Sequence, residues 1–120
     1  MAKSGYVVVL ITTSSYDEAR KIADALVAQR KAACVNIVPG VNSLFRWKGK
    51  IEEAEESLMI VKTRAKLFPE VMNLVKSIHS YEVPEIIALP IVEGNPDYLA
   101  WLNEETGGDE KKDKDKRRQA

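Results

Sequence analysis

The sequence predicts one α+β domain with the element order β-α-β-β-α-β and an extra helix at its C-terminal end. Three observations lead to this prediction. Apolar or β-branched runs recur at residues 5–13, 32–47, 51–63 and 84–92, apolar residues repeat at helical spacing in two other segments, and 120 residues suffice for one compact domain but not for two. The order is that of the ferredoxin-like sandwich, a four-stranded antiparallel sheet with both helices on one face.

The first two elements are a strand over residues 5–13 and a helix over residues 15–31. The strand is continuously apolar and β-branched, which is typical of a strand near the centre of a sheet. Ser15 and Glu18 have the spacing of a capping box at the start of the helix. The apolar stripe of that helix contains Ala19, Ile22, Ala23, Leu26 and Val27.

A long hairpin is predicted from residues 32–47 and 51–63. Pro39-Gly40 interrupts the first of these strands, which indicates a bulge or bend because proline cannot donate to a sheet ladder. Gly49 is free to take the positive φ of the turn. The hairpin is longer than the core of so small a domain needs, so we expect it to project and to leave edges that require a partner.

The second helix is predicted at residues 66–80 and the last strand at residues 84–92. Pro69 fits the first turn of the helix, and His79 lies at its C-terminal end. The strand is rich in isoleucine and is delimited by Pro84 and Pro90. With one sheet face left uncovered in this arrangement, we expect oligomerisation.

The chain ends with a short helix at residues 95–106 and a charged tail. Asn95 is the expected N-cap of this helix. Residues 109–120 contain ten charged residues and no large apolar one, so they cannot bury enough surface to offset their ordering entropy. We therefore predict a folded domain over residues 1–106 and a disordered tail over residues 107–120.

Composition excludes several classes of protein. The chain has 18 basic and 18 acidic residues, so its formal net charge is zero and no nucleic-acid partner is expected. No apolar run reaches the roughly 18 residues that span a bilayer, so no membrane association is expected. The single cysteine excludes an intrachain disulfide and fits a reducing compartment, which favours the cytoplasm.

Candidate metal ligands are His79, Glu82 and Cys34. His79 is either a helix C-terminal residue that interacts with the helix dipole, or a metal ligand or proton carrier. Cys34 lies in an apolar strand, where a free cysteine is usually a small buried hydrophobe, and its alternative role is ligation or reactivity. Asn36 is expected on the face opposite Cys34. No nucleophilic triad and no glycine-rich phosphate loop is recognisable.

Other polar and aromatic residues are candidates for a ligand cleft. Lys62 ends an apolar strand, where it either snorkels or supplies a charge to a cleft. Four amphipathic aromatics suit an interface, a ligand wall or an ordinary core: Trp47, Tyr81, Tyr98 and Trp101. The run of Glu52, Glu53, Glu55 and Glu56 is interpreted as a solvated rim of the hairpin rather than a cation site.

Three segments together resemble one family. They are "KAACVNIVPGVNSLFRWKGKIEE" (31–53), "LMIVKT" (58–63) and "HSYEVPEIIALPIVEGNPDYLAWL" (79–102). Their motifs, AACVNI-x-PG, W-x-GK, a Lys-Thr strand end, Y-x-VPEI and Y-L-x-WL, occur in the order found in the CutA family of divalent-cation tolerance proteins. The resemblance covers roughly residues 6–105.

The resemblance implies a ferredoxin-like homotrimer whose hairpins extend sheets across subunits, with small effectors bound in clefts between subunits. It places five residues in that cleft: Lys62, Trp47, Tyr81, Glu85 and Tyr98. In some members copper is assigned to a first-strand cysteine and two adjacent histidines. Those positions here are Ile11 and the pair Ile78-His79, so only His79 is retained.

The predicted function is therefore a non-enzymatic homotrimer in divalent metal tolerance and homeostasis. It requires no cofactor, and weak binding of copper or another divalent cation is part of the prediction. The alternative is a signalling trimer with a small-molecule effector in its intersubunit clefts, where Lys62 and Glu85 orient an anionic or polar ligand. An enzyme with His79 or Glu82 as general base is a third interpretation, disfavoured by the lack of paired catalytic groups.

Overall fold

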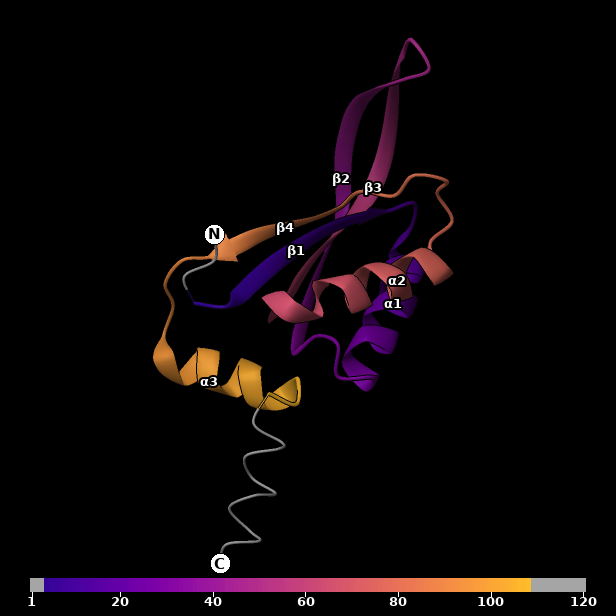
Figure 1. Ribbon diagram of the computed structural model, residues 1–120. Coiled ribbons are helices and arrows are strands. Elements are labelled where there is room, and N and C mark those ends of the chain that lie inside the picture. Colours follow the sequence, from indigo (N-terminus) through magenta and orange to yellow (C-terminus); the bar gives the residue numbers. More distant parts are fainter. Residues whose placement is uncertain (1–3, 109–120) are drawn as a thin grey trace, which may run out of the picture.

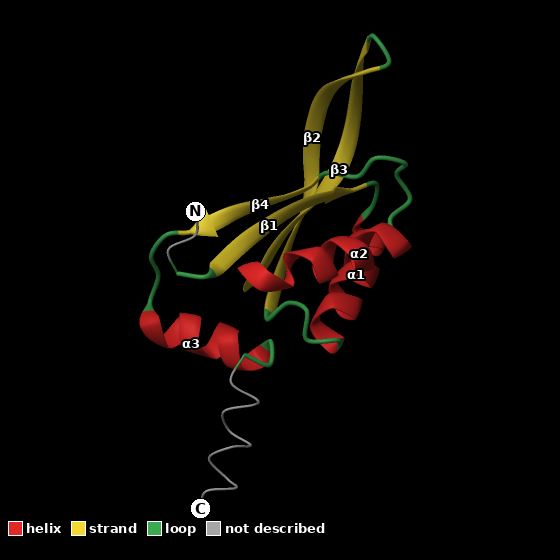
Figure 2. Cartoon of the chain, viewed as in Figure 1, coloured by secondary structure: helices red, strands yellow, loops and turns green. Residues whose placement is uncertain are grey.

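The computed structural model describes residues 4–108 and confirms the predicted element order (Figure 1). The four strands form one sheet in the order β2-β3-β1-β4, and each neighbouring pair is antiparallel (Figure 2). The elements are β1 (Tyr6–Thr13), α1 (Tyr16–Ala28), β2 (Cys34–Trp47), β3 (Lys50–Arg64), the 3₁₀ turn η1 (Ala65–Leu67), α2 (Phe68–Ile78), β4 (Ile86–Ile91) and α3 (Pro96–Glu105).

The core lies between one face of the sheet and the pair α1 and α2 (Figure 1). Alternate residues of the two central strands point into it, because side chains on a strand alternate between its faces. The fully or almost fully buried residues from the sheet are Val7, Val9, Ile11, Met59 and Val61, and those from the helices include Ile22, Leu26, Val71 and Val75.

The opposite face of the sheet is also apolar. The strand register places Val8 and Leu10 of β1, Leu58 and Ile60 of β3, and Ile87 and Leu89 of β4 on this side. Ile87 and Leu89 keep 49% and 48% of their surface exposed. We call this group the open face. Its exposure in a single chain agrees with the prediction that one face lacks a cover.

The β2–β3 hairpin projects beyond the body of the sheet (Figure 2). Its two-residue turn has positive φ at both Lys48 (52°) and Gly49 (80°), which is the type I′ geometry that matches the twist of paired strands. The register shifts between Val38 and Val41, and Gly40 has φ of 73°. The bulge predicted from Pro39-Gly40 is therefore confirmed.

Helix ends follow the predicted capping, with one variation. The Ser15 hydroxyl accepts a hydrogen bond from the Glu18 N–H at 3.1 Å, as in a capping box. The Glu18 carboxylate, however, accepts from the N–H of Ser14 rather than from that of the cap residue. Asn95 caps α3 through the Asp97 N–H at 3.0 Å.

Two boundaries differ from the sequence prediction. Pro90 pairs with Val7 inside β4 instead of delimiting it, which is possible because β4 is an edge strand and needs no donor on its outer side. Residues 107–108 form the C-terminal cap of α3, with the Gly108 N–H bonded to the Asn103 carbonyl at 2.8 Å. The disorder predicted for the rest of the tail concerns residues 109–120, which lie outside the described part.

Within residues 4–108, no helix is long and apolar enough to cross a membrane.

Candidate functional site

The five predicted cleft residues fall into two groups within the chain. Lys62 lies near the C-terminal end of β3, beside Cys34, which also contacts Tyr98 of α3. Trp47, next to the hairpin turn, lines one hollow with Tyr81 and Glu85. Trp47 pairs with Lys50, which is twelve residues from Lys62 along β3. At about 3.3 Å per residue, Trp47 is roughly 40 Å from Lys62 in one chain, whereas the Tyr81 hydroxyl, bonded to Glu56 six residues from Lys62, is roughly 20 Å away.

The Lys62 group is a compact polar cluster. The Lys62 ammonium donates to the Asn36 side-chain oxygen and lies 3.9 Å from the Cys34 sulfur. Burial, and then the adjacent Cys34 thiol, raise the pKa of the Tyr98 phenol. Asn36 therefore shares a face with Cys34, and the expectation that it lies opposite was wrong, because residues two apart in a strand point to the same side.

The second group lines a hollow that we call the hairpin groove. It has two lobes, of about 550 and 460 Å³, which share Phe45, Trp47, Tyr81 and Val83. The first lobe is completed by Glu52, Glu53, Ala54, Ser80 and Glu82, and the second by Thr12, Asn42, Ser43, Leu44, Glu56 and Glu85. The structure thus brings together three of the five predicted cleft residues.

Tyr81 is held in the hairpin groove by a buried carboxylate. Its hydroxyl donates to Glu56 at 2.7 Å, and Glu56 keeps only 7% of its surface exposed. Burial, with the Glu56 carboxylate beside it, raises the pKa of the Tyr81 phenol, so this residue is a neutral donor at physiological pH. The solvated rim predicted for the glutamate run is wrong for Glu56, because its carboxylate is buried where it accepts the Tyr81 hydroxyl.

His79 is the C-cap residue of α2, and it is buried with 9% of its surface exposed. Its Nε2 lies 2.7 Å from the Thr12 carbonyl oxygen, and its Nδ1 accepts the Tyr81 N–H at 3.0 Å. A neutral imidazole with the proton on Nε2 satisfies both bonds. Metal ligation by either nitrogen would require one of them to break.

The predicted metal ligands do not converge within one chain. Cys34 pairs with Lys62, whereas His79 bonds to Thr12, whose partner on β3 is Leu58, four residues away. Glu82 is exposed on the loop after α2. Among the described residues, no three His, Cys, Asp or Glu side chains are grouped so as to hold a metal ion.

Sequence reasoning missed a hydrogen-bond network that joins the two loops beside His79. The Glu18 carboxylate accepts the N–H of Ser80 at 2.8 Å and that of Ser14 at 3.1 Å. Burial opposes ionisation of Glu18, but hydrogen bonds from Ser80 and Ser14 outweigh it and lower the pKa of this carboxyl. The Ser15–Glu18 spacing identified the residue but not this partner, which is 62 positions away.

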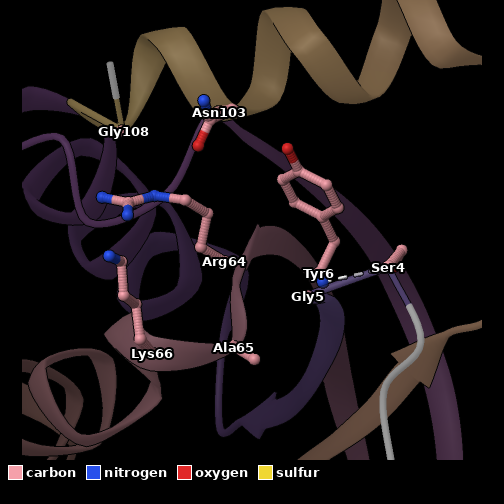
Figure 3. Close-up of a pocket in the computed structure, with 8 residues that line it drawn as sticks. All are labelled: Ser4, Gly5, Tyr6, Arg64, Ala65, Lys66, Asn103 and Gly108. Carbon is pink, nitrogen blue, oxygen red and sulfur yellow. Dashed lines mark hydrogen bonds between the residues drawn. The ribbon is translucent and has the colours of Figure 1, made fainter. Parts of the chain in front are cut away.

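A third hollow of about 340 Å³ lies beside the C-terminal end of α3, between Tyr6, Arg64, Lys66 and Asn103 (Figure 3). One of its two cations, Arg64, already has a structural role. The Arg64 guanidinium donates to the Thr106 hydroxyl at 2.8 Å and to the Thr106 carbonyl at 2.7 Å. Arg64 therefore fastens the end of α3 to the sheet.

Comparison with known sequences gives one consistent result. A family model described as "CutA1 divalent ion tolerance protein" matches residues 7–105. A divalent-cation tolerance protein CutA from Thermus thermophilus is 57% identical over 100 residues, which span 83% of this chain and 97% of the relative. Protein CutA of the mouse is 46% identical over 108 residues, which span 86% of this chain but only 61% of the mouse protein.

Solved structures agree with these sequence matches. The divalent cation tolerance protein from Thermus thermophilus superposes with a TM-score of 0.83 at 56% identity, covering 85% of this chain and 99% of that one. A CutA from Archaeoglobus fulgidus, named as periplasmic, gives 0.82 at 46% identity and covers 84% and 98%. An Arabidopsis thaliana relative, 43% identical over 100 residues (83% of this chain and 55% of the relative), is named as chloroplastic, so these names do not support the predicted cytoplasmic location.

Proposed function

The chain belongs to the CutA1 family of divalent ion tolerance proteins, and on this basis we propose that it acts as a non-enzymatic homotrimer in divalent metal tolerance. In this proposal, small ligands bind in clefts between subunits. The proposed location is the cytoplasm, where the free Cys34 stays reduced.

The open face and the projecting hairpin are the observations that support the proposed trimer. Leu44 and Ile51 of the hairpin keep 70% of their surface exposed, and the open face adds Ile87 and Leu89. Neighbouring strands bring the open-face residues together, and an exposed apolar surface of this kind marks an interface in a folded protein. A cyclic assembly covers it with the same surface of other copies.

The proposed assembly also explains why the five predicted cleft residues fall into two groups within one chain. Trp47 is roughly 40 Å from Lys62 in one chain, so a single chain does not form the five-residue cleft. In the proposed assembly, the hairpin groove of one subunit, with Trp47 from the hairpin and Tyr81 from the loop after α2, lies beside Lys62 and Tyr98 of a neighbouring subunit. We therefore propose that the cleft is shared between subunits.

Divalent cations, copper included, bind weakly in this proposal and are not resident cofactors. Because the candidate ligands of one chain do not converge, their sites use side chains from more than one subunit. Catalysis is not part of the proposal, since the single histidine already uses both ring nitrogens within the fold.

The second candidate function is that of a signalling trimer with a small-molecule effector. The aromatic hairpin groove favours it, because ligand sites are concave and lined by apolar and aromatic side chains with a few polar groups. The two functions differ in what must occupy the cleft.

Light scattering at micromolar concentration tests the assembly, and a trimer is the expected result. Leu89→Asp, on the open face, should dissociate it. Val27→Asp, on α1 with a similar exposed fraction (45% against 48%), should not. A monomeric wild-type protein would refute the proposal. Growth at raised copper of a bacterium lacking its own CutA protein, with and without this chain, tests the tolerance function.

A further inference from the structure

We propose that the hairpin groove binds an organic cation, an alkylated ammonium of the choline type. This inference rests on the ligand cleft of the proposed function and names the chemical class of its ligand.

Aromatic side chains form the walls of the hairpin groove. Phe45 and Trp47 are two residues apart on β2 and therefore point to the same side, and Tyr81 reaches the same hollow from the loop after α2. The faces of such rings carry negative potential and attract ammonium groups, and several rings around one hollow form the usual receptor for quaternary ammonium.

The charged residues that line the groove are all carboxylates. Glu52, Glu53 and Glu82 line the first lobe, and Glu56 and Glu85 line the second. None of the described residues that line either lobe is lysine, arginine or histidine. The proposed assembly adds one cation to the cleft, the neighbouring subunit's Lys62, which is held by Asn36 of its own chain and is outnumbered by these five carboxylates. The field of one chain in this groove therefore favours a cation.

The arrangement suits a large cation and not a metal ion. A divalent metal needs several oxygen ligands at contact distance, and no such group of side chains is found in residues 4–108. An alkylated ammonium needs no coordination, because its diffuse charge is stabilised by ring faces and by carboxylates at a greater distance. The first lobe, of about 550 Å³, has ample room for such an ion.

The chain itself makes the contact that we propose for the ligand. The Lys48 ammonium lies 5.8 Å from the centroid of the Trp47 ring, within the range of cation–π attraction. The Trp47 ring is thus accessible to a positive charge in the folded protein. Lys48 is also a competing cation, so its removal should favour the external ligand.

Titration of the full chain with choline chloride tests the inference, read from line broadening of the choline methyl resonance. The neutral control is 3,3-dimethyl-1-butanol, which has the same shape without the charge. We expect choline to bind at least about tenfold more tightly, because only a cation gains from the ring faces and carboxylates. Equal binding of the two compounds would overturn the inference.

Variants separate the groove from other surfaces. Trp47→Leu keeps apolar bulk without an aromatic face and should weaken choline binding by about tenfold, whereas Trp101→Leu on α3 should leave it unchanged. Glu52→Gln with Glu82→Gln should weaken it by about fivefold, and Glu55→Gln, on the same strand but outside the groove, should not. Equal effects within either pair contradict the inference.

Two further measurements complete the design. Lys48→Gln should tighten choline binding, and weaker binding would contradict the role of the ring. Light scattering on the same samples separates the two proposals. A trimer that fails to bind choline overturns the ligand class alone, whereas a monomer that binds choline overturns the assembly alone.

Discussion

Replacement of His79 by alanine distinguishes a structural histidine from a metal ligand. The imidazole is buried between β1 and the loop after α2, where Nε2 bonds to the Thr12 carbonyl and Nδ1 to the Tyr81 N–H. Each lost bond is worth about 1 kcal/mol, and a buried polar group left without its partner costs about 1–3 kcal/mol. We expect His79→Ala to lower the free energy of unfolding by about 2–4 kcal/mol.

The assay is chemical denaturation at one fixed protein concentration, since the stability of an oligomer depends on concentration. Copper affinity is measured in parallel by competition with a chelator. Because both ring nitrogens are used within the fold, the affinity should be the same in His79→Ala and in the wild type. Glu82→Ala is the matched control, and as an exposed substitution it should change stability by less than about 0.5 kcal/mol.

A different pair of results would refute this reasoning. If His79→Ala lowers copper affinity by more than about tenfold, a change of 1.4 kcal/mol or more, while stability falls by less than about 1 kcal/mol, His79 is a ligand. Its hydrogen bonds would then be incidental to folding.

Three other substitutions test separate parts of the structure. Glu18→Gln should lower the free energy of unfolding by about 1 kcal/mol at pH 7. Because the pKa of Glu18 is lowered in the folded state, the difference in stability from the wild type should vanish as pH falls below that pKa. A stability difference that does not change with pH would contradict this. Arg64→Ala should speed amide hydrogen exchange in α3 but not in β1, and uniform exchange would exclude the tether to Thr106. Gly40→Ala should lower the free energy of unfolding by about 1 kcal/mol. The cause is backbone strain alone, since φ is 73° and no atom lies within 4 Å of the added Cβ. An unchanged midpoint of denaturant unfolding would contradict this prediction.

The fold was largely predictable because its information is local. The strand and helix periods, the Ser15 and Asn95 caps, and the break at Pro39-Gly40 each act within a few residues. The misplaced end of the last strand has a non-local cause. Pro90 is tolerated only because β4 lies at the edge of the sheet, and edge position is a property of the whole topology.

The sequence was enough to identify several residues of the candidate site, but not the residues to which they bond. The sequence identified His79 and Lys62 as unusual, yet their partners Thr12 and Asn36 are 67 and 26 positions away. Glu56 was grouped with its solvated neighbours, although its contact with Tyr81, from a loop 25 positions away, buries it. Such pairings depend on register and loop packing, which no short window of sequence determines.

The separation of the Lys62 group from the hairpin groove provides a direct test of a shared cleft. Cys34 lies beside Lys62, and it is the only cysteine in the chain. Trp47→Cys introduces a second thiol thirteen residues along β2, about 40 Å away in the same chain. A short bismaleimide cannot span that distance, so it can join the two thiols only between subunits.

Denaturing electrophoresis of the cross-linked protein should therefore show covalent dimers and trimers. Wild-type protein, with Cys34 alone, and Val27→Cys, with an exposed second thiol on α1, should remain single chains. If Trp47→Cys behaves like these controls while light scattering shows a trimer, the two groups do not meet in the assembly. The hairpin groove would then be a site of one subunit, and Lys62 would have no part in its ligand.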